Sequence, residues 1–259
     1  MKKTNDDSFC HSLFSNLNIG KSTLLSFSVL CLVLFGCVST NVSKRDPYGS
    51  MVRIADKARK SGNHEAAMNF YKRAMEIDPE HPSACLGLAE CCLDKKLLDA
   101  ANDYIKKAED KGCNRRISTY LRGKMLLLRG SVAEAEKIFS RNGSVDAMNA
   151  LGAICASRGQ HKKAQDIFKK VIARDTNYIH AYRNLGLSLM CCKQYKDAIF
   201  YLENACYMKD ANISNRMDLA LAYGLSGNVQ KAREIYAQDF DGRVLEEKVA
   251  ALEDLLAEK

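Results

Sequence analysis

The residues best suited to chemistry in this chain are its eleven cysteines and five histidines. Cysteines typically hold zinc or carry out redox reactions in the Cys-x-x-Cys spacing, in which two residues separate them, because both side chains then reach the same partner. The closest cysteine pairs, Cys91-Cys92 and Cys191-Cys192, are direct neighbours in the sequence. A disulfide between sequence neighbours is strained. We therefore predict no metal site and no redox motif.

Motifs typical of enzymes are also missing. The sequence contains no glycine-rich phosphate loop, no Gly-x-Ser-x-Gly and no His-Glu-x-x-His. The net charge of +8 comes from interleaved basic and acidic residues, without the basic stripe and interleaved aromatics of nucleic-acid-binding proteins. We therefore expect no enzymatic activity, no cofactor, no small-molecule substrate and no nucleic acid, and the mild positive charge suits an anionic membrane.

The beginning of the chain has the features of an export signal. An apolar run covers residues 24–35. It is shorter than the about 20 apolar residues of a membrane-spanning helix, and it has the length of a signal-peptide core. The run ends in Leu34-Phe35-Gly36-Cys37, which resembles the bacterial lipobox.

This resemblance implies a lipoprotein. Residues 1–36 would be the signal peptide, Cys37 would become the acylated first residue, and residues 37–47 would form a lipidated tether. Val38 follows the cysteine, and by similarity to lipoprotein sorting signals this favours the periplasmic face of the outer membrane of a Gram-negative bacterium. The alternative is an uncleaved N-terminal anchor.

A repeat dominates the rest of the chain. Six alanines lie 34, 34, 29, 34 and 34 residues apart: Ala67, Ala101, Ala135, Ala164, Ala198 and Ala232. A large apolar residue follows each alanine by four positions, and a small residue precedes it by 12. Small residues let two helices cross closely, and the large residue fills the space beside the crossing. The spacing therefore predicts a series of helix pairs, which an ordinary helical bundle would not hold.

The pattern resembles the tetratricopeptide repeat (TPR) family. The resemblance implies an all-α superhelical solenoid of about six helix-turn-helix repeats over residues 48–246. We place the units at 48–81, 82–115, 116–144, 145–178, 179–212 and 213–246. Cys85, Cys92 and Cys155 fall on core positions of these units, where cysteine packs as a small apolar residue.

Two segments depart from the regular repeat. The third unit is five residues short and ends in Ser140-Arg141-Asn142-Gly143, so we expect its second helix to end early and the array to loosen there. Residues 247–259 are expected to form a C-terminal capping helix, because the end unit of a solenoid must shield its last apolar face.

Partners of TPR proteins usually bind the concave surface lined by the first helix of each unit. The predicted groove is Leu86, Leu93, Tyr120, Leu127, Arg183, Leu187, Met190, Met217 and Leu221. Because this set is mostly apolar, it predicts that an apolar or amphipathic segment of a partner protein binds there. The alternative is that the C-terminal helix folds back over part of this groove.

The layout of a lipidated chain with six TPR units resembles the TadD family of tight-adherence (Flp) pilus assembly proteins. This resemblance implies a scaffold that assists the assembly or stability of a secretin. A pilotin of type IV pili and an adaptor for peptidoglycan hydrolases are the alternatives, and the identity of the partner separates the three.

Overall fold

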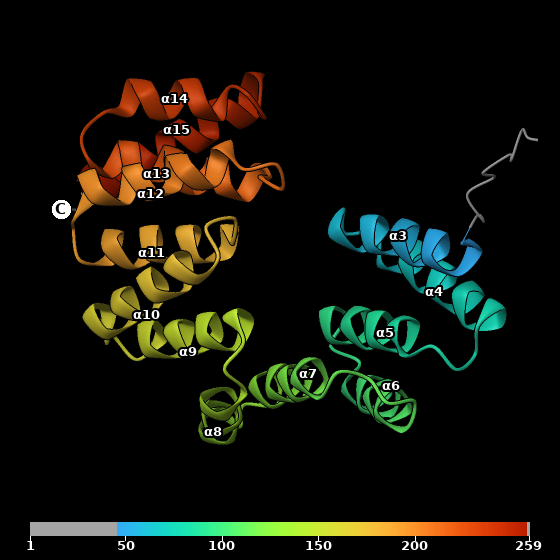
Figure 1. Ribbon diagram of the computed structural model, residues 1–259. Coiled ribbons are helices and arrows are strands. Elements are labelled where there is room, and N and C mark those ends of the chain that lie inside the picture. Colours follow the sequence, from blue (N-terminus) through green and yellow to red (C-terminus); the bar gives the residue numbers. More distant parts are fainter. Residues whose placement is uncertain (1–45, 258–259) are drawn as a thin grey trace, which may run out of the picture. The chain divides into compact units, whose positions relative to one another are not determined.

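The computed structural model describes residues 46–257, and all regular structure among them is α-helical (Figure 1). The expected signal peptide (1–36), Cys37 and nearly all of the tether (37–47) lie outside the described residues. The helices are α3 (Pro47–Lys60), α4 (His64–Ile77), α5 (Pro82–Asp94), α6 (Leu98–Asp110), α7 (Arg115–Leu128), α8 (Val132–Asn142), α9 (Val145–Ser157), α10 (His161–Arg174), α11 (Ile179–Cys191), α12 (Tyr195–Tyr207), α13 (Ile213–Leu225), α14 (Val229–Tyr236) and α15 (Gly242–Ala257).

The helices pack in chain order as six pairs followed by a single helix. Within a pair the two helices pack together, as α3 does with α4, and the second helix also packs on the first helix of the next pair. Successive first helices contact each other as well, as α3 does with α5. This is the all-α TPR solenoid that the repeat spacing predicts.

The core of each pair follows from the small and large residues of the repeat. All six repeat alanines, from Ala67 to Ala232, are 0% exposed. The large residue that follows each alanine packs against a small residue of the facing helix. A Cβ added to Gly123 would lie 2.4 Å from the Phe139 ring, and one added to Gly152 would lie 2.5 Å from Phe168. Glycine at these positions therefore lets the helices approach, and the aromatic ring fills the crossing.

The turn between the helices of a pair requires a left-handed backbone in every unit. Four units place glycine there, such as Gly62 with φ 81° and Gly159 with φ 74°. The second and fifth units instead place Lys96 (φ 58°) and Lys193 (φ 57°) at this position. A side chain with a Cβ is disfavoured in this conformation, so these two turns hold local strain that the other four avoid.

The third unit loosens the array, as its short sequence predicts. Helix α8 has 11 residues and ends at Asn142, where Gly143 turns left-handed with φ 70°. Close packing joins α5 to α7 and α9 to α11, but α7 and α9 do not pack together to the same degree. The break in the repeat therefore weakens the contact between successive first helices.

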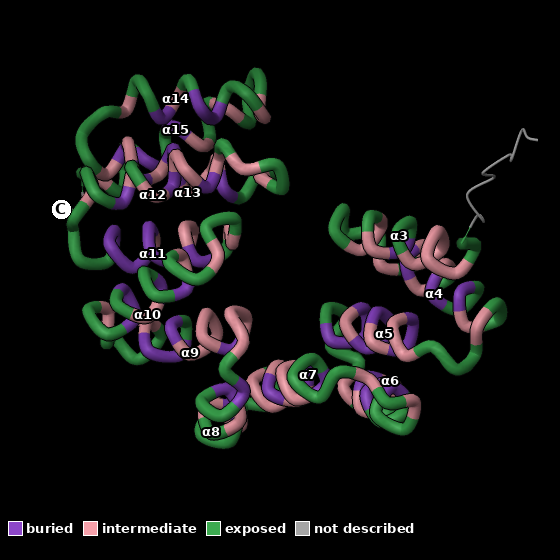
Figure 2. The backbone as a smooth tube through the Cα atoms, viewed as in Figure 1, coloured by how far each residue is buried: buried purple, intermediate pink, exposed green. Residues whose placement is uncertain are grey.

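The last helix, α15, caps the array. It packs on α13 and α14 (Figure 2). Val249 and Leu252 of this helix join the core of the last units. A Cβ added to Gly224 of α13 would lie 2.2 Å from the Leu252 side chain. The helix therefore shields the final apolar face, and it covers the first-helix surface at Gly224.

Candidate protein-binding surface

The candidate site is the first-helix surface, which we define as the outward-facing side chains of α3, α5, α7, α9, α11 and α13. Seven of the predicted groove residues are partly exposed there: Leu86, Tyr120, Leu127, Arg183, Leu187, Met217 and Leu221. In the second half of the array, Leu187, Met217 and Leu221 all pack at the edge of the same core. They offer a partly exposed apolar strip over α11 and α13.

Two predicted groove residues lie in the core instead. Leu93 is 1% exposed and packs with Ala101 and Leu121, and Met190 is 9% exposed within the core of the last units. Both occupy the same position near the end of a first helix. Because successive first helices pack closely here, that position turns toward the neighbouring helix and not toward solvent. Leu93 and Met190 therefore present little surface to a partner, although Leu93 lines a small pocket together with Leu127.

Charged side chains join the first helices of the first three units. Arg59 of α3 binds Glu90 of α5 at 2.7 Å and lies 3.9 Å from Asp94. Lys124 of α7 lies 3.9 Å from the other carboxylate oxygen of Asp94. His64 comes within 3.7 Å of the same residue. Alternating charges thus link α3, α5 and α7 across the surface.

Burial raises the pKa values of two groups in or beside this charged network, Glu90 and Tyr71. The pKa of Glu90 is raised, because desolvation outweighs the opposing effect of Arg59. Tyr71 donates a hydrogen bond to Asp56, and its pKa is raised, first by burial and then by this carboxylate. Tyr71 therefore stays neutral and fixes Asp56 at the surface.

Polar contacts of a different kind join the first helices of the last three units. Asn184 of α11 donates from Nδ2 to Oδ1 of Asn149 of α9 at 3.1 Å. Arg183 donates from Nε to Asp218 of α13 at 2.5 Å. In this arrangement Nδ2 of Asn149 and Oδ1 of Asn184 have no partner among residues 46–257. One amide hydrogen-bond donor and one acceptor are therefore available beside the apolar strip.

Two further groups set the charge of this region. Tyr178 donates to Asp146 at 2.7 Å, and its pKa is raised by burial and by that carboxylate. The pKa of His180 is lowered, first by burial and then by the positive charge of Arg183. His180 is therefore neutral at pH 7, because its ordinary pKa of about 6.5 already lies below that value.

The described residues offer little for metal chemistry or membrane crossing. Among residues 46–257, no group of three His, Cys, Asp or Glu side chains could hold a metal ion. No helix in the same range is long and apolar enough to cross a membrane. Eight cysteines in this range are free thiols, and Cys85, Cys92 and Cys155 are buried, as the repeat predicts.

The polar partners on this surface were not predicted from the sequence, namely Asp56, Asp94, Asn149, Asp218 and Tyr178. Most pair with a residue 30 to 35 positions away, such as Arg183 with Asp218. The sequence feature that could have predicted these pairs is that positions on the first-helix surface of neighbouring units hold opposite charges, as Arg59 and Glu90 do. A prediction based on apolar residues alone does not include it.

Parts of the chain are similar to known tetratricopeptide-repeat sequences. Two family models described as tetratricopeptide repeat match residues 58–114 and 145–178. The chain contains tetratricopeptide repeats. BBSome complex member BBS4 of Bos taurus is 27% identical over 124 residues, which cover 45% of this chain and 24% of that relative. The chain thus spans about a quarter of the length of this curated relative.

Two solved structures, of PilW and of PilF, have a similar fold. PilW, described as a widely conserved type IV pilus biogenesis factor, has a TM-score of 0.53 at 20% identity, over 75% of this chain and 92% of PilW. Pseudomonas aeruginosa PilF has a TM-score of 0.55 at 16% identity, over 83% of this chain and 98% of PilF. At these identities the likeness is one of fold, and it extends over nearly the whole of PilW and PilF.

Proposed function

We propose that this TPR protein is a scaffold that captures a segment of a partner protein on α9, α11 and α13. The observation that carries the proposal is the apolar strip of Leu187, Met217 and Leu221 beside the amide pair Asn149 and Asn184. An apolar strip binds alternate or helically spaced apolar side chains. A free amide donor and acceptor side by side can satisfy the backbone of the bound segment, which would otherwise lose hydrogen bonds to water.

The partner that we propose belongs to a pilus-assembly apparatus. The fold likeness to PilW and PilF supports this assignment, because it covers 92% and 98% of those chains. PilW is a biogenesis factor of type IV pili, which favours the type IV pilotin as the second candidate beside the Flp pilus scaffold that assists a secretin. An adaptor for peptidoglycan hydrolases remains the third candidate.

Lipidation at Cys37 would hold this scaffold at the periplasmic face of the outer membrane. Each buried methylene of an acyl chain contributes about 0.8 kcal/mol to membrane binding, so several chains anchor a protein firmly. The support for this part of the proposal is the sequence Leu34-Phe35-Gly36-Cys37. The proposed mechanism is that the lipid fixes the position of the scaffold and the first-helix surface selects the client.

The test is purification of the tagged full chain from gently solubilised envelopes, followed by mass spectrometry of the proteins bound to it. Leu187→Asp should reduce the recovered partner at least about tenfold, because a carboxylate on the apolar strip must be desolvated when the segment binds. Phe200→Asp is the matched control, since Phe200 lies on α12 of the same unit and is 59% exposed.

The outcomes separate the parts of the proposal. Full recovery of the partner by Leu187→Asp would refute binding at the apolar strip. A secretin or pilin-assembly component that is lost only with Leu187→Asp supports the pilus role, whereas murein hydrolases would replace that role with the third candidate. Loss of outer-membrane fractionation in Cys37→Ser supports the anchor, and unchanged fractionation refutes it.

A further inference from the structure

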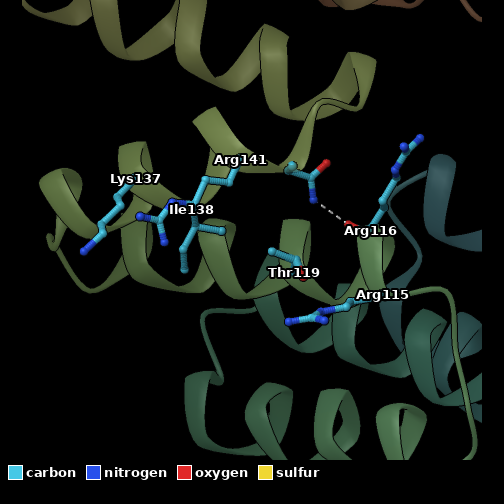
Figure 3. Close-up of a pocket in the computed structure, with 7 residues that line it drawn as sticks. Arg115, Arg116, Thr119, Lys137, Ile138 and Arg141 are labelled. Carbon is cyan, nitrogen blue, oxygen red and sulfur yellow. Dashed lines mark hydrogen bonds between the residues drawn. The ribbon is translucent and has the colours of Figure 1, made fainter.

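A basic pocket of about 550 Å³ lies between α7 and α8, away from the proposed partner-binding strip (Figure 3). Helix α7 lines it with Arg115 and Thr119, and α8 lines it with Lys137, Ile138 and Arg141. In Figure 3 the side chain of Arg116 points away from these groups. Three positively charged side chains, a hydroxyl group and one apolar side chain therefore line the pocket, and in Figure 3 the amine of Lys137 extends away from Arg115 at its far end.

The pocket results from the shortened third unit. The second helices of the first, second, fourth and fifth units have 13 or 14 residues, whereas α8 has 11 and ends at Asn142. The first turn of α7 is consequently left exposed at Arg115 and Arg116. Asn142 is 8% exposed and donates to the backbone carbonyl of Arg116 at 2.7 Å. This bond fixes the end of α8 against the start of α7 and holds the pocket open.

The net charge of the protein is concentrated in the segment that contains this pocket. Residues 115–178 contain 13 Lys and Arg against 5 Asp and Glu, while the rest of the chain contains 26 of each. The expectation of interleaved charges is therefore wrong for this segment. A region with one dominant sign of charge raises the local concentration of counter-ions, so an anion is the expected ligand.

The pocket cations are not neutralised by the protein. Among residues 46–257, no carboxylate forms an ion pair with Arg115, Lys137 or Arg141. The nearby carboxylate of Glu109 is bound by Arg122 at 2.6 Å. This hydrogen bond is the main cause of the lowered pKa of Glu109, and the positive charge of Arg115 lowers that pKa further. The three cations therefore remain available to a ligand from outside.

We propose that this pocket binds a phosphate group. A carboxylate carries a single charge, whereas a phosphate monoester carries about −1.5 to −2 and three strong acceptor oxygens. The two guanidinium groups of Arg115 and Arg141 can each form a fork of hydrogen bonds to phosphate oxygens. Lys137 adds a third charge, and Ile138 contacts the apolar part of the ligand. The phosphate comes either from a lipid headgroup or from a free phosphate compound.

Isothermal titration calorimetry on the full chain in neutral detergent at low salt tests this site, with inorganic phosphate as the probe. Arg115→Gln/Arg141→Gln should weaken phosphate binding about tenfold or more, because both forks are lost. The control Lys162→Gln/Lys163→Gln removes the same charge from exposed positions of α10 within the same basic segment. It should change the affinity by less than about twofold, since solvent-exposed charges on another helix interact only weakly with the ligand through water.

Soluble dihexanoyl phosphatidic acid, with dihexanoyl phosphatidylcholine as its zwitterionic control, identifies the source. Tighter binding of phosphatidic acid than of inorganic phosphate assigns the site to lipid headgroups, and equal or weaker binding assigns it to free phosphate compounds. The proposal is overturned if acetate binds as well as phosphate, or if both double variants lose affinity equally. Circular dichroism of each variant verifies that the exposed substitutions leave the fold intact. Capture of a partner at Leu187 is unaffected by either result.

Discussion

The two halves of the array differ in how their cores are connected. From α9 to α15, the buried residues between Cys155 and Leu252 form one continuous cluster. The buried residues before Cys155 fall into three smaller clusters, centred on Tyr71, Ile105 and Phe139, and the last of these includes Ala147 and Ile154 of α9. In a repeat protein each unit is stabilised by its neighbours through shared buried surface. The second half should therefore unfold as one unit, whereas the first half should open in pieces.

The same division appears on the first-helix surface. The first half presents the network of Arg59, Glu90, Asp94 and Lys124, in which charges of both signs alternate. The second half presents the apolar strip and the Asn149–Asn184 amide pair. A rigid half with an apolar surface suits the capture of a client, because little conformational entropy is lost on binding.

The largest effect should come from deleting the aromatic ring at equivalent positions of the third and fourth units. Phe139 and Phe168 are 0% and 1% exposed, and each packs on a glycine of its own unit. Phe139→Ala and Phe168→Ala should each cost about 3–5 kcal/mol of unfolding free energy. The cost should spread differently, because only Phe168 belongs to the continuous core.

Hydrogen exchange resolved by mass spectrometry distinguishes the two variants. Phe168→Ala should accelerate exchange throughout α9–α15, whereas Phe139→Ala should affect α7, α8 and the start of α9. An equal spread of lost protection in both variants would contradict the division of the array into a continuous and a segmented half.

A smaller effect is expected at the two turns that place lysine in a left-handed conformation. Lys96→Gly in the first half and Lys193→Gly in the second should each stabilise its turn by about 1 kcal/mol, because glycine relieves the Cβ strain. Gly159→Lys, at the same turn position with φ 74°, should destabilise by a similar amount. Thermal unfolding measures all three. If Lys193→Gly does not raise the midpoint of the second half, the strain assigned to this turn is not real.

The smallest effect should come from two arginine–carboxylate pairs, one in each half. Arg122 binds Glu109 at 2.6 Å and Arg216 binds Asp239 at 2.5 Å, and both carboxyl pKa values are lowered, first by these hydrogen bonds. Since the folded pKa lies below the unfolded value of about 4, each pair stabilises the protein above that pH. The contribution is lost as the pH falls through the lowered pKa.

Glu109→Gln and Asp239→Asn should therefore lose less stability than the unmodified protein between about pH 5 and pH 3. Because the pairs are partly exposed, each difference should stay below about 1 kcal/mol. Urea unfolding at a series of pH values provides the measurement. A variant whose stability falls as steeply with acid as that of the unmodified protein would show that its carboxylate does not titrate with folding.

Much of the fold could be predicted from the sequence, because the determinants of a TPR unit recur at fixed spacing. Ala67 and Tyr71 identify one helix crossing, and the same pair of positions identifies the other five. The early end of α8 was also predictable, since Gly143 follows a unit that lacks five residues. These features depend on contacts within one unit, which sequence spacing describes well.

The surface was less predictable, because it depends on how far each first helix is rotated against the next. A small rotation decides that Leu187 stays partly exposed while Met190 is buried. It also brings Arg183 to Asp218, 35 positions later. The pocket at Arg115 and Arg141 arises where the repeat is interrupted, so the regular pattern does not describe it.

The central claim, that the second half of the first-helix surface captures a partner, is tested most directly by crosslinking in intact cells. A photo-reactive amino acid is placed at Leu187 in one strain and at Phe200 in another, and the adducts are identified by mass spectrometry. We predict one major adduct from position 187, with a pilus-assembly component, and none from position 200. No adduct from position 187, or the same adducts from both positions, would contradict the claim.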